Sequence, residues 1–207
     1  MVWDKSEAKE KFMRIIVATK NTHKIREISE MFCPLGFEVI SQADAGIDID
    51  VEETGDTFEK NALIKARAVS LVSDDYVLAD DSGLCVESLD GRPGVMSARY
   101  AGEGASDTDK INKILDELSD MPNRRAKFVT AMAFIMPDGT EIVTTGEVNG
   151  RITKEPMGEN GFGYDPIFFS DELEKTFAMA TADEKNSVSH RSRALKALYD
   201  KLSEGEE

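Results

Sequence analysis

The sequence predicts an α/β fold, in which one sheet carries both parallel and antiparallel pairing and is flanked by helices. The first observation is the order strand, helix, strand, helix, strand in the N-terminal part of the chain, which is typical of parallel pairing. The second is a pair of β-rich runs joined at Asp138-Gly139, a strong signal for an antiparallel hairpin. The third is the composition. With 207 residues, of which 41% are hydrophobic and 31% charged, the chain can build a core as one two-lobed domain.

The regular structure is expected to start with a strand at 14–18 (RIIVA), where β-branched residues cluster. A polar loop begins at Thr19. From Thr22 onward apolar residues recur at helical spacing, which predicts a helix. A second strand is expected at 37–40. The polar loop therefore lies between the end of a strand and the start of a helix.

An acidic, glycine-containing stretch at 44–56 leads into a long helix expected at 57–73. The apolar positions of this helix are Phe58, Ala62, Ile64, Ala68 and Leu71. A third strand is expected at 76–79, running into Asp80. The segment 85–94, which is punctuated by glycine and proline, is interpreted as a connector between two lobes.

The second half of the chain is predicted to contain two further helices and antiparallel strands. The expected elements are a helix at 106–118, hairpin strands at 126–137 and 140–148, a glycine-dense loop at 158–164, a short strand at 167–169 and a closing helix at 191–202. Leu195, Leu198 and Leu202 share one face of the closing helix.

The charge balance restricts the possible partners. Asp and Glu number 40 against 25 Lys and Arg, a net charge of −15, so the chain should repel polymeric nucleic acid. A small anionic ligand would need a local cluster of basic residues. The apolar runs fall far short of the roughly 18 to 20 residues of a membrane span, and the N-terminus lacks the apolar stretch of a signal peptide. We therefore expect no membrane partner and a cytoplasmic protein, with an N-terminal extension at 1–13 and a domain at 14–203.

The cysteines and the common nucleotide motifs exclude several chemistries. Cys33 and Cys85 lie in apolar company without CxxC spacing, so we expect buried free thiols. The sequence contains no GxxxxGK[ST] P-loop and no glycine triplet in Rossmann spacing. The segment 26–30 is similar to part of a Nudix box, but Met31 stands where a second acid is needed.

Two segments suggest a phosphate site beside carboxylates. The polar loop consists of Thr19, Lys20, Asn21, Thr22, His23 and Lys24, and backbone N–H groups at a helix start attract anions. The alternative for this loop is a helix cap with solvated lysines. Asp80-Asp81-Ser82-Gly83 ends the third predicted strand, where ligand crevices often form. The carboxylate pair Glu52-Glu53 could complete an oxygen-ligand Mg²⁺ site with it, although acidic turns and solvated loops explain both pairs equally well.

Two later segments suggest a site for a base. The segment 159–166 holds Phe162 and Tyr164 between glycines, which suits close backbone approach and stacking. Its alternative is a tight turn with Phe162 tucked inward. The segment 185–191 turns locally basic and holds one of the two histidines, as anion capture requires. Solvated cations near a helix are the alternative there.

Taken in order, these segments strongly resemble the inosine triphosphate pyrophosphatase family, the non-canonical purine nucleoside triphosphate pyrophosphatases. The resemblance runs from about Arg14 to Leu202 and is carried by IIVATKNTHK, EETGDTFEKNALIKA, LADDSGLCVESLDGRPGVMSARYAG, GENGFGYDPIF and SHRSRALKAL. Lys20 departs from the pattern, because the family often has a small residue there. The resemblance implies a long mixed sheet, a cleft between two lobes, and hydrolysis of ITP, dITP and XTP to the monophosphate and pyrophosphate with Mg²⁺. It also implies a homodimer.

The resemblance further implies roles for individual residues. The loop from Thr19 to Lys24 would cradle the phosphates with help from Lys65, and Glu53 and Asp81 would serve the metal. Asp81 would also accept the proton. Ser82 would touch the substrate. The nucleoside pocket and the base contacts would come from Phe162, Gly163, Tyr164, Asp165, Lys185, His190 and Arg191.

Two other functions stay open at this point. One is a related septum-inhibitor-type pyrophosphatase that acts on pyrimidine or modified nucleotides, against which the SHR segment argues. The other is a regulator that binds a nucleotide without turnover, which the intact Asp81 and Glu53 disfavour.

Overall fold

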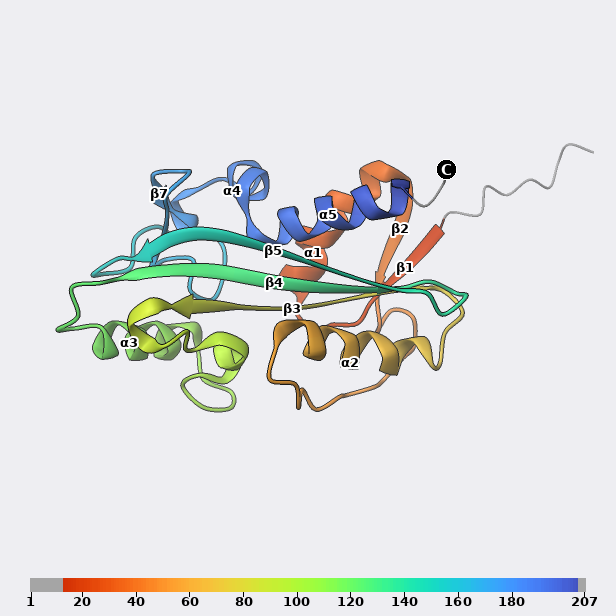
Figure 1. Cartoon of the computed structure of the whole chain (residues 1–207), viewed down its shortest axis with the longest axis horizontal. Coiled ribbons are helices and arrows are strands. Elements are labelled where there is room, and N and C mark those ends of the chain that lie inside the picture. Colours follow the sequence, from red (N-terminus) through yellow and green to blue (C-terminus); the bar gives the residue numbers. More distant parts are fainter. Residues whose placement is uncertain (1–12, 205–207) are drawn as a thin grey trace, which may run out of the picture.

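A seven-stranded mixed sheet in the order β2-β1-β3-β4-β5-β6-β7 runs along the molecule (Figure 1). The computed structural model describes residues 13–204, so the predicted N-terminal extension lies outside the described residues except for Met13. The strands are β1 (Met13–Val17), β2 (Phe37–Ser41), β3 (Tyr76–Val86), β4 (Arg125–Ile135), β5 (Glu141–Ile152), β6 (Phe168–Ser170) and β7 (Lys175–Thr176). The helices are α1 (Thr22–Phe32), α2 (Phe58–Ser70), α3 (Asp107–Glu117), α4 (Ala182–Val188) and α5 (His190–Glu204). The predicted α/β class with a long mixed sheet is confirmed.

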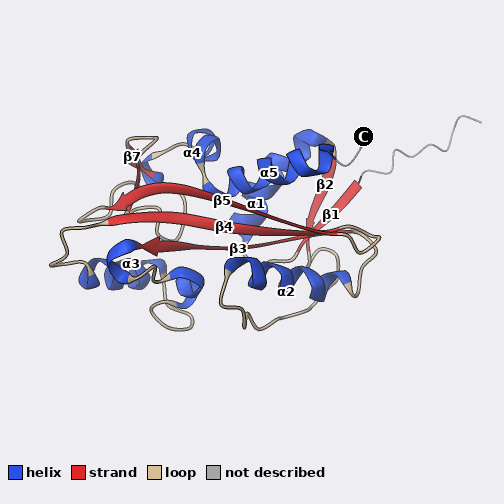
Figure 2. Cartoon of the chain, in the orientation of Figure 1, coloured by secondary structure: helices blue, strands red, loops and turns tan. Residues whose placement is uncertain are grey.

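Helices cover both faces of the sheet (Figures 1 and 2). On one face, α1 and α5 pack over β1, β3 and β4, where Ile28 and Leu198 are fully buried. On the other face, α2 packs through Ala62 and Ala66. At the far end of the sheet, α3 covers a third cluster that includes Phe128. One end of the sheet is therefore covered by α1 and α5 on one face and by α2 on the other, and the two lobes share the long strands β3, β4 and β5.

The start of each helix follows from a local capping residue. Asn21 accepts hydrogen bonds from the backbone N–H groups of His23 and Lys24, and Thr57 caps α2 in the same way. Ser106 forms a capping box at the start of α3. Such side chains satisfy N–H groups that the first turn leaves unpaired. The position of Asn21 sets where α1 begins, and hence where Lys24 projects.

The third strand is much longer than predicted. It continues to Val86, paired with β4 from Val77 to Val86, so the predicted strand end at 79 is wrong. The Asp80-Asp81 pair lies within the strand and not in a turn at its end. The predicted connector therefore starts only after Val86, with the 3-10 helix Glu87–Leu89. The alternating apolar pattern failed here because polar residues in this strand face a pocket and charged partners.

By contrast, β1 stops early, and this creates an open edge. It pairs with β3 only up to Leu78, and the Ala18 N–H donates the last backbone bond to the Leu78 carbonyl at 2.8 Å. In the described part of the chain, no strand pairs with β3 on this side from Ala79 to Leu84, and only an isolated bridge between Cys85 and Pro93 follows. The Asp80 carbonyl therefore points out of the sheet, where side chains from the two flanking helices reach it.

Three smaller expectations are corrected. Leu71 is not on the buried face of α2: the helix ends at Ser70 and Leu71 is 85% exposed. Both cysteines are free as predicted, but Cys33 is exposed and Cys85 is half-buried. The helix α4, which carries Lys185, was not predicted, and the closing helix begins at His190, one residue before the expected start.

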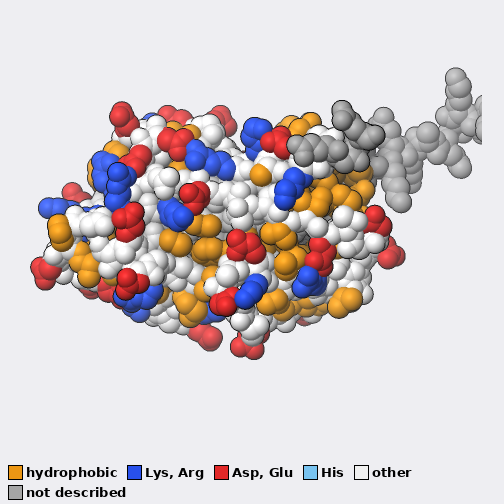
Figure 3. Space-filling view, viewed as in Figure 1, with side chains coloured by type: hydrophobic (Ala, Val, Ile, Leu, Met, Phe, Trp, Pro, Cys, Tyr) orange, Lys and Arg blue, Asp and Glu red, His pale blue; other side chains and the backbone are white. Residues whose placement is uncertain are grey.

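The molecular surface and the helices agree with the composition. Acidic side chains are spread over the face shown in Figure 3, with basic ones among them. Among the described residues, no helix has both the length and the apolar character that crossing a membrane requires.

Gly146 tests how closely β5 and α5 pack. A Cβ at this position would lie 2.2 Å from the His190 carbonyl oxygen and 2.4 Å from the Ala194 nitrogen, both backbone atoms. Gly146→Ala should lower the free energy of unfolding by about 1–3 kcal/mol, because the helix must move away. Thr145→Ala, on the exposed side of the same strand, should change it by less than about 0.5 kcal/mol in urea unfolding. Equal effects of the two changes would contradict this packing.

Candidate active site

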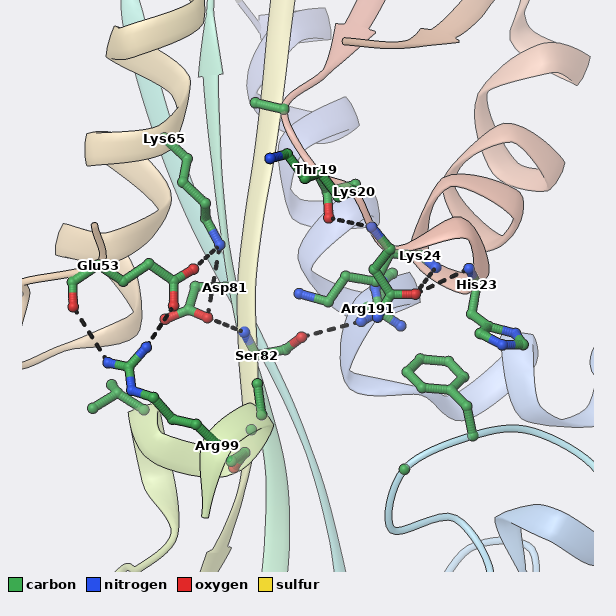
Figure 4. A pocket seen from close by; sticks show the side chains of 18 of the residues that line it. Thr19, Lys20, His23, Lys24, Glu53, Lys65, Asp81, Ser82, Arg99 and Arg191 are labelled. Carbon is green, nitrogen blue, oxygen red and sulfur yellow. Dashed lines mark hydrogen bonds and ion pairs between the residues drawn. The ribbon is translucent and has the colours of Figure 1, made fainter. Parts of the chain in front are cut away.

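A pocket of about 640 Å³ lies where the open edge of β3 meets the start of α1, the side of α2 that carries Lys65, the start of α5 and the 158–165 loop. Figure 4 shows the side chains of part of its lining. Of the residues assigned from the sequence, the pocket is lined by Thr19, Lys20, Asn21, His23, Lys24, Glu53, Lys65, Asp81, Ser82, Phe162, Gly163, Tyr164, Asp165, Lys185, His190 and Arg191. Thr22 does not line it. The predicted segments therefore meet at one place in the fold.

The loop at the start of α1 combines capping with charge. Asn21 Oδ1 accepts from His23 N at 3.0 Å and Lys24 N at 3.3 Å, so the helix-cap alternative is confirmed for this residue. Lys20 is exposed and pairs with Asp50 at the pocket rim, with Nζ 3.3 Å from Oδ2. Lys24 instead points inward. Burial lowers the pKa of Lys24, against the attraction of Asp80.

Asp80 is completely buried and forms the centre of a cluster of charges. Its Oδ2 lies 3.0 Å from Lys24 Nζ and 3.2 Å from an Arg191 amino nitrogen, and it accepts from Ser82 Oγ at 3.1 Å. Burial alone would raise the pKa of Asp80, but Lys24, Arg191 and Lys65 hold it well below its ordinary value. Asp80 Oδ1 has no hydrogen-bond partner among residues 13–204. The carboxylate therefore stays ionised inside the protein.

The cluster continues through Glu27 to the loop that holds Phe162. Glu27 accepts from Arg191 and, at 3.0 Å, from Lys185 Nζ. Lys185 also donates to Asp165 Oδ2 at 2.8 Å. A chain of alternating charges thus joins Asp80, Arg191, Glu27, Lys185 and Asp165. It holds α1, α4, α5 and the loop against β3.

A second group of charges lies on the α2 side of the same strand. Asp81 accepts from Asn61 Nδ2 at 3.0 Å, and its Oδ1 is 3.9 Å from Lys65 Nζ. Lys65 donates to Glu53 Oε1 at 2.6 Å, and Arg99 lies 3.7 Å from Glu53 Oε2. Burial raises the pKa of Asp81, Lys65 opposes this, and the charge of Glu53 adds to it. Asp81 is therefore a carboxylate that takes up a proton more readily than usual.

The two lysines approach the open edge of β3 from opposite faces of the sheet. Lys65 Nζ donates to the Asp80 carbonyl oxygen at 2.8 Å, and Lys24 Nζ lies 3.4 Å from the same atom. Two ammonium groups are thus held together over one strand edge. This arrangement is suited to binding a polyanion.

The carboxylates also fit a hard divalent cation. In the described part of the chain, no group of three or more His, Cys, Asp or Glu side chains is placed to hold a metal. Mg²⁺, however, is usually bound by one or two carboxylates together with substrate phosphates. Glu53 and Asp81, which share Lys65, supply such a pair at the pocket wall. Glu52 is exposed, and Glu53 is the one that contacts Lys65.

The opposite end of the pocket is aromatic. His190 is buried, with its ring stacked on Phe128 at a centroid distance of 4.9 Å, and its Nδ1 has no partner among the described residues. Burial and the nearby Arg191 lower the pKa of His190 well below its usual value. Tyr164 donates its hydroxyl to the Ser97 carbonyl at 2.9 Å and so holds the loop in place.

Three residues of the site, Asn61, Glu27 and Arg99, were not predicted from the sequence, and neither was the structural role of Asp80. Asn61 was detectable as a polar residue one helical turn before Lys65 on the face of α2 that packs against the sheet. Glu27 lies three residues after Lys24 on the same face of α1. Arg99 stands in the quoted SARYAG segment, but nothing local links it to Glu53.

The chain is similar to known proteins over nearly its whole length. A model of the Ham1 family matches residues 15–201. The dITP/XTP pyrophosphatase of Bacillus cereus is 46% identical over 199 residues, 94% of this chain and 97% of its own length. The Bacillus subtilis protein of that name is 48% identical over 185 residues, 88% and 93% of the two chains. The Staphylococcus aureus Ham1 protein has a TM-score of 0.83 at 43% identity, covering 94% of this chain and 100% of its own. For a HAM1 protein from Coxiella burnetii the TM-score is 0.84 at 39% identity, with 93% and 100% covered.

The buried neutral His190 should make stability depend on pH. The folded protein holds it uncharged, whereas the unfolded chain takes up a proton below about pH 6.5, so the unfolded state binds more protons there and stability falls as pH falls. The slope is at most about 1.4 kcal/mol per pH unit. His190→Gln lacks this group. The stability gap between wild type and variant in urea unfolding should therefore narrow from about pH 7.5 to 5.5. A constant gap would show that His190 titrates alike in the folded and unfolded states, and a widening gap would show that the fold holds it protonated.

Proposed function

The chain belongs to the Ham1 family, and from this premise we propose that it hydrolyses ITP, dITP and XTP to the nucleoside monophosphate and pyrophosphate. The relatives named dITP/XTP pyrophosphatase align with nearly the whole chain. The observation that carries the proposal has two parts. Asp81 and Glu53 both approach Lys65, and Lys65 and Lys24 converge on one strand edge. This end of the pocket suits a triphosphate, and the aromatic end suits a base.

The phosphates are assigned to the cationic edge of β3. Lys24 and Lys65 would bind phosphate oxygens, and the backbone N–H groups of the loop from Thr19 to Lys24 would add contacts at the start of α1. Glu53 and Asp81 would hold Mg²⁺, which when bound neutralises and polarises phosphate oxygens. Arg99, which already contacts Glu53, would keep that carboxylate in place.

Asp81 is assigned as the general base. A water oxygen attacks the α-phosphorus, the bond from that phosphorus to the bridging oxygen of pyrophosphate breaks, and the proton of the water passes to Asp81. Burial favours proton uptake by this carboxylate, which suits a base. Asn61 donates to Asp81 Oδ2 and the Ser82 N–H donates to Asp81 Oδ1 at 3.0 Å, so both contacts fix the carboxylate while its remaining lone pairs can accept the proton.

The base is assigned to the aromatic end. Hypoxanthine and xanthine offer an acceptor at O6 and a donor at N1, so protein donors would accept them and leave adenine mismatched. Arg191 already donates to Glu27, Asp80 and Ser82, which leaves few of its five N–H groups for a base. His190, Lys185 and the backbone of the loop that holds Phe162 are the remaining candidates. Guanine would be rejected through its 2-amino group.

We infer a domain at 14–203, a homodimer and a cytoplasmic protein that acts on a small nucleotide. The septum-inhibitor-type pyrophosphatase and the non-catalytic regulator are the competing functions. Incubation with Mg²⁺ and ITP, dITP, XTP, ATP, GTP or modified pyrimidine triphosphates separates the three. The proposal expects pyrophosphate and monophosphate in equal amounts, with ITP and XTP preferred; preference for pyrimidines, or binding without turnover, would contradict it.

Asp81→Asn tests the assigned base and metal ligand. The amide keeps the shape of the Asp81 side chain and its position beside Asn61, but it cannot accept the proton. Loss of a general base costs about 10²- to 10⁴-fold in kcat, and a lost metal ligand adds to it. Pyrophosphate release from ITP should fall at least that far, while Asp74→Asn, an exposed residue just before β3, should be unchanged. More than a tenth of wild-type turnover in Asp81→Asn would remove Asp81 from this role.

Lys65→Met tests the electrostatic coupling of Lys65 to Asp81. Lys65 lowers the pKa of Asp81, so its loss raises that pKa further, and the base becomes ionised only at higher pH. The acid limb of the kcat/KM profile should move to higher pH, and kcat/KM at pH 8 should drop by roughly 10- to 100-fold. Lys60→Met, on the exposed side of α2, is the matched control. An acid limb that does not move would mean that Asp81 is not the group titrating.

A further inference from the structure

His23 and Phe162, from two different parts of the chain, are in contact with one another at the wall of the pocket. Their rings are stacked, with centroids 5.0 Å apart and planes within 16° of parallel. His23 belongs to the first turn of α1, and Phe162 to the glycine-rich loop. Both line the pocket. In Figure 4 the His23 ring extends from the start of α1 at the opposite side of the view from Glu53 and Lys65.

Each ring is held by contacts that do not involve the other. The His23 N–H donates to the capping residue Asn21 at 3.0 Å, which fixes the turn that carries the ring. The Phe162 N–H donates to Asp165 Oδ2 at 2.9 Å, and the next N–H, that of Gly163, donates to Asp107 Oδ2 at 2.7 Å. The two rings are therefore presented by separately anchored backbone segments, and parting them breaks neither anchor.

The arrangement of the two planes suits a third flat ring. Two aromatic faces on either side of a base need a centroid separation of about 7 Å, twice a carbon contact distance of roughly 3.5 Å. The present 5.0 Å would have to widen by about 2 Å, and His23 is an exposed side chain free to turn about χ1 and χ2. The edge-on pair Phe32 and Phe37, at 89°, could not receive a planar ligand in this way.

Resting on the function proposed above, we propose that His23 and Phe162 form a two-sided stacking slot that holds the purine base. Phe162 supplies one face from the loop and His23 the other from the helix that also carries Lys24. Stacking does not read the edge of the base, so the slot adds affinity for any purine nucleotide and leaves the choice among purines to donors such as Lys185 and His190. His23 thereby couples the base to the same helix turn that binds phosphate.

Two substitutions of His23 separate its aromatic face from its polarity. His23→Asn keeps a polar side chain of similar reach without a ring, and His23→Phe keeps the ring. The ligands are inosine 5′-[α,β-imido]triphosphate, which is not cleaved at the α–β bond, and inorganic tripolyphosphate, which has no base. Their dissociation constants are measured by calorimetry with Mg²⁺. Tyr199→Asn, which removes an exposed aromatic ring of α5 outside the pocket, is the control.

The slot predicts that His23→Asn weakens binding of the inosine analogue by roughly 5- to 30-fold. Tripolyphosphate binding should stay unchanged, and His23→Phe should restore the analogue to within about 3-fold of wild type. Unchanged or tighter binding by His23→Asn would overturn the slot and make the pair a plug that the base displaces. Equal losses for both ligands, or no rescue by His23→Phe, would also overturn it.

The outcome is separable from that of the proposed function. If the wild type releases no pyrophosphate from ITP but the analogue shows this pattern, the pyrophosphatase activity fails and the slot stands. If the wild type turns over ITP and His23→Asn binds the analogue normally, the slot alone fails.

Discussion

The carboxylate of Asp80 is fully removed from water, and the arrangement of the pocket depends on how its charge is compensated. A buried unpaired charge is costly enough that proteins neutralise it or pair it. Here Lys24 from α1 and Arg191 from α5 converge on one oxygen, and Glu27 and Lys185 extend the pairing to the 158–165 loop. Segments far apart in the sequence are thus held in position by one ionic network, and the same network presents Lys24 at the pocket.

The alternation of a β-strand explains how two adjacent aspartates are accommodated. Neighbouring side chains of a strand point to opposite faces. Asp80 therefore meets the cations of α1 and α5, while Asp81 meets Asn61 and Lys65 of α2. The two carboxylates differ in consequence: the pKa of Asp80 is held low by its cations, and burial raises that of Asp81. One is suited to fixing structure and the other to proton transfer.

The sequence predicted which residues line the pocket better than it predicted the boundaries of the elements. The lysines, carboxylates and loop aromatics were found because each stands in a short contiguous segment of unusual composition. The length of β3 was missed, because Asp80, Asp81 and Ser82 read as a turn unless their partners in other elements are known. Glu27 was missed for the same reason, since its partner Arg191 is 164 positions away in the chain. Local pattern identifies reactive side chains, but the compensation of buried charge depends on tertiary contacts.

The division of roles between Asp80 and Asp81 is tested most directly by comparing Asp80→Asn with Asp81→Asn in urea unfolding. Asp80→Asn leaves Lys24 and Arg191 without their shared counter-ion and should lower the free energy of unfolding by about 3–5 kcal/mol. Asp81→Asn replaces a carboxylate that folding already drives toward its neutral form, and should change stability by less than about 1 kcal/mol. Equal stability losses in the two variants, or a fully stable Asp80→Asn protein, would contradict the account.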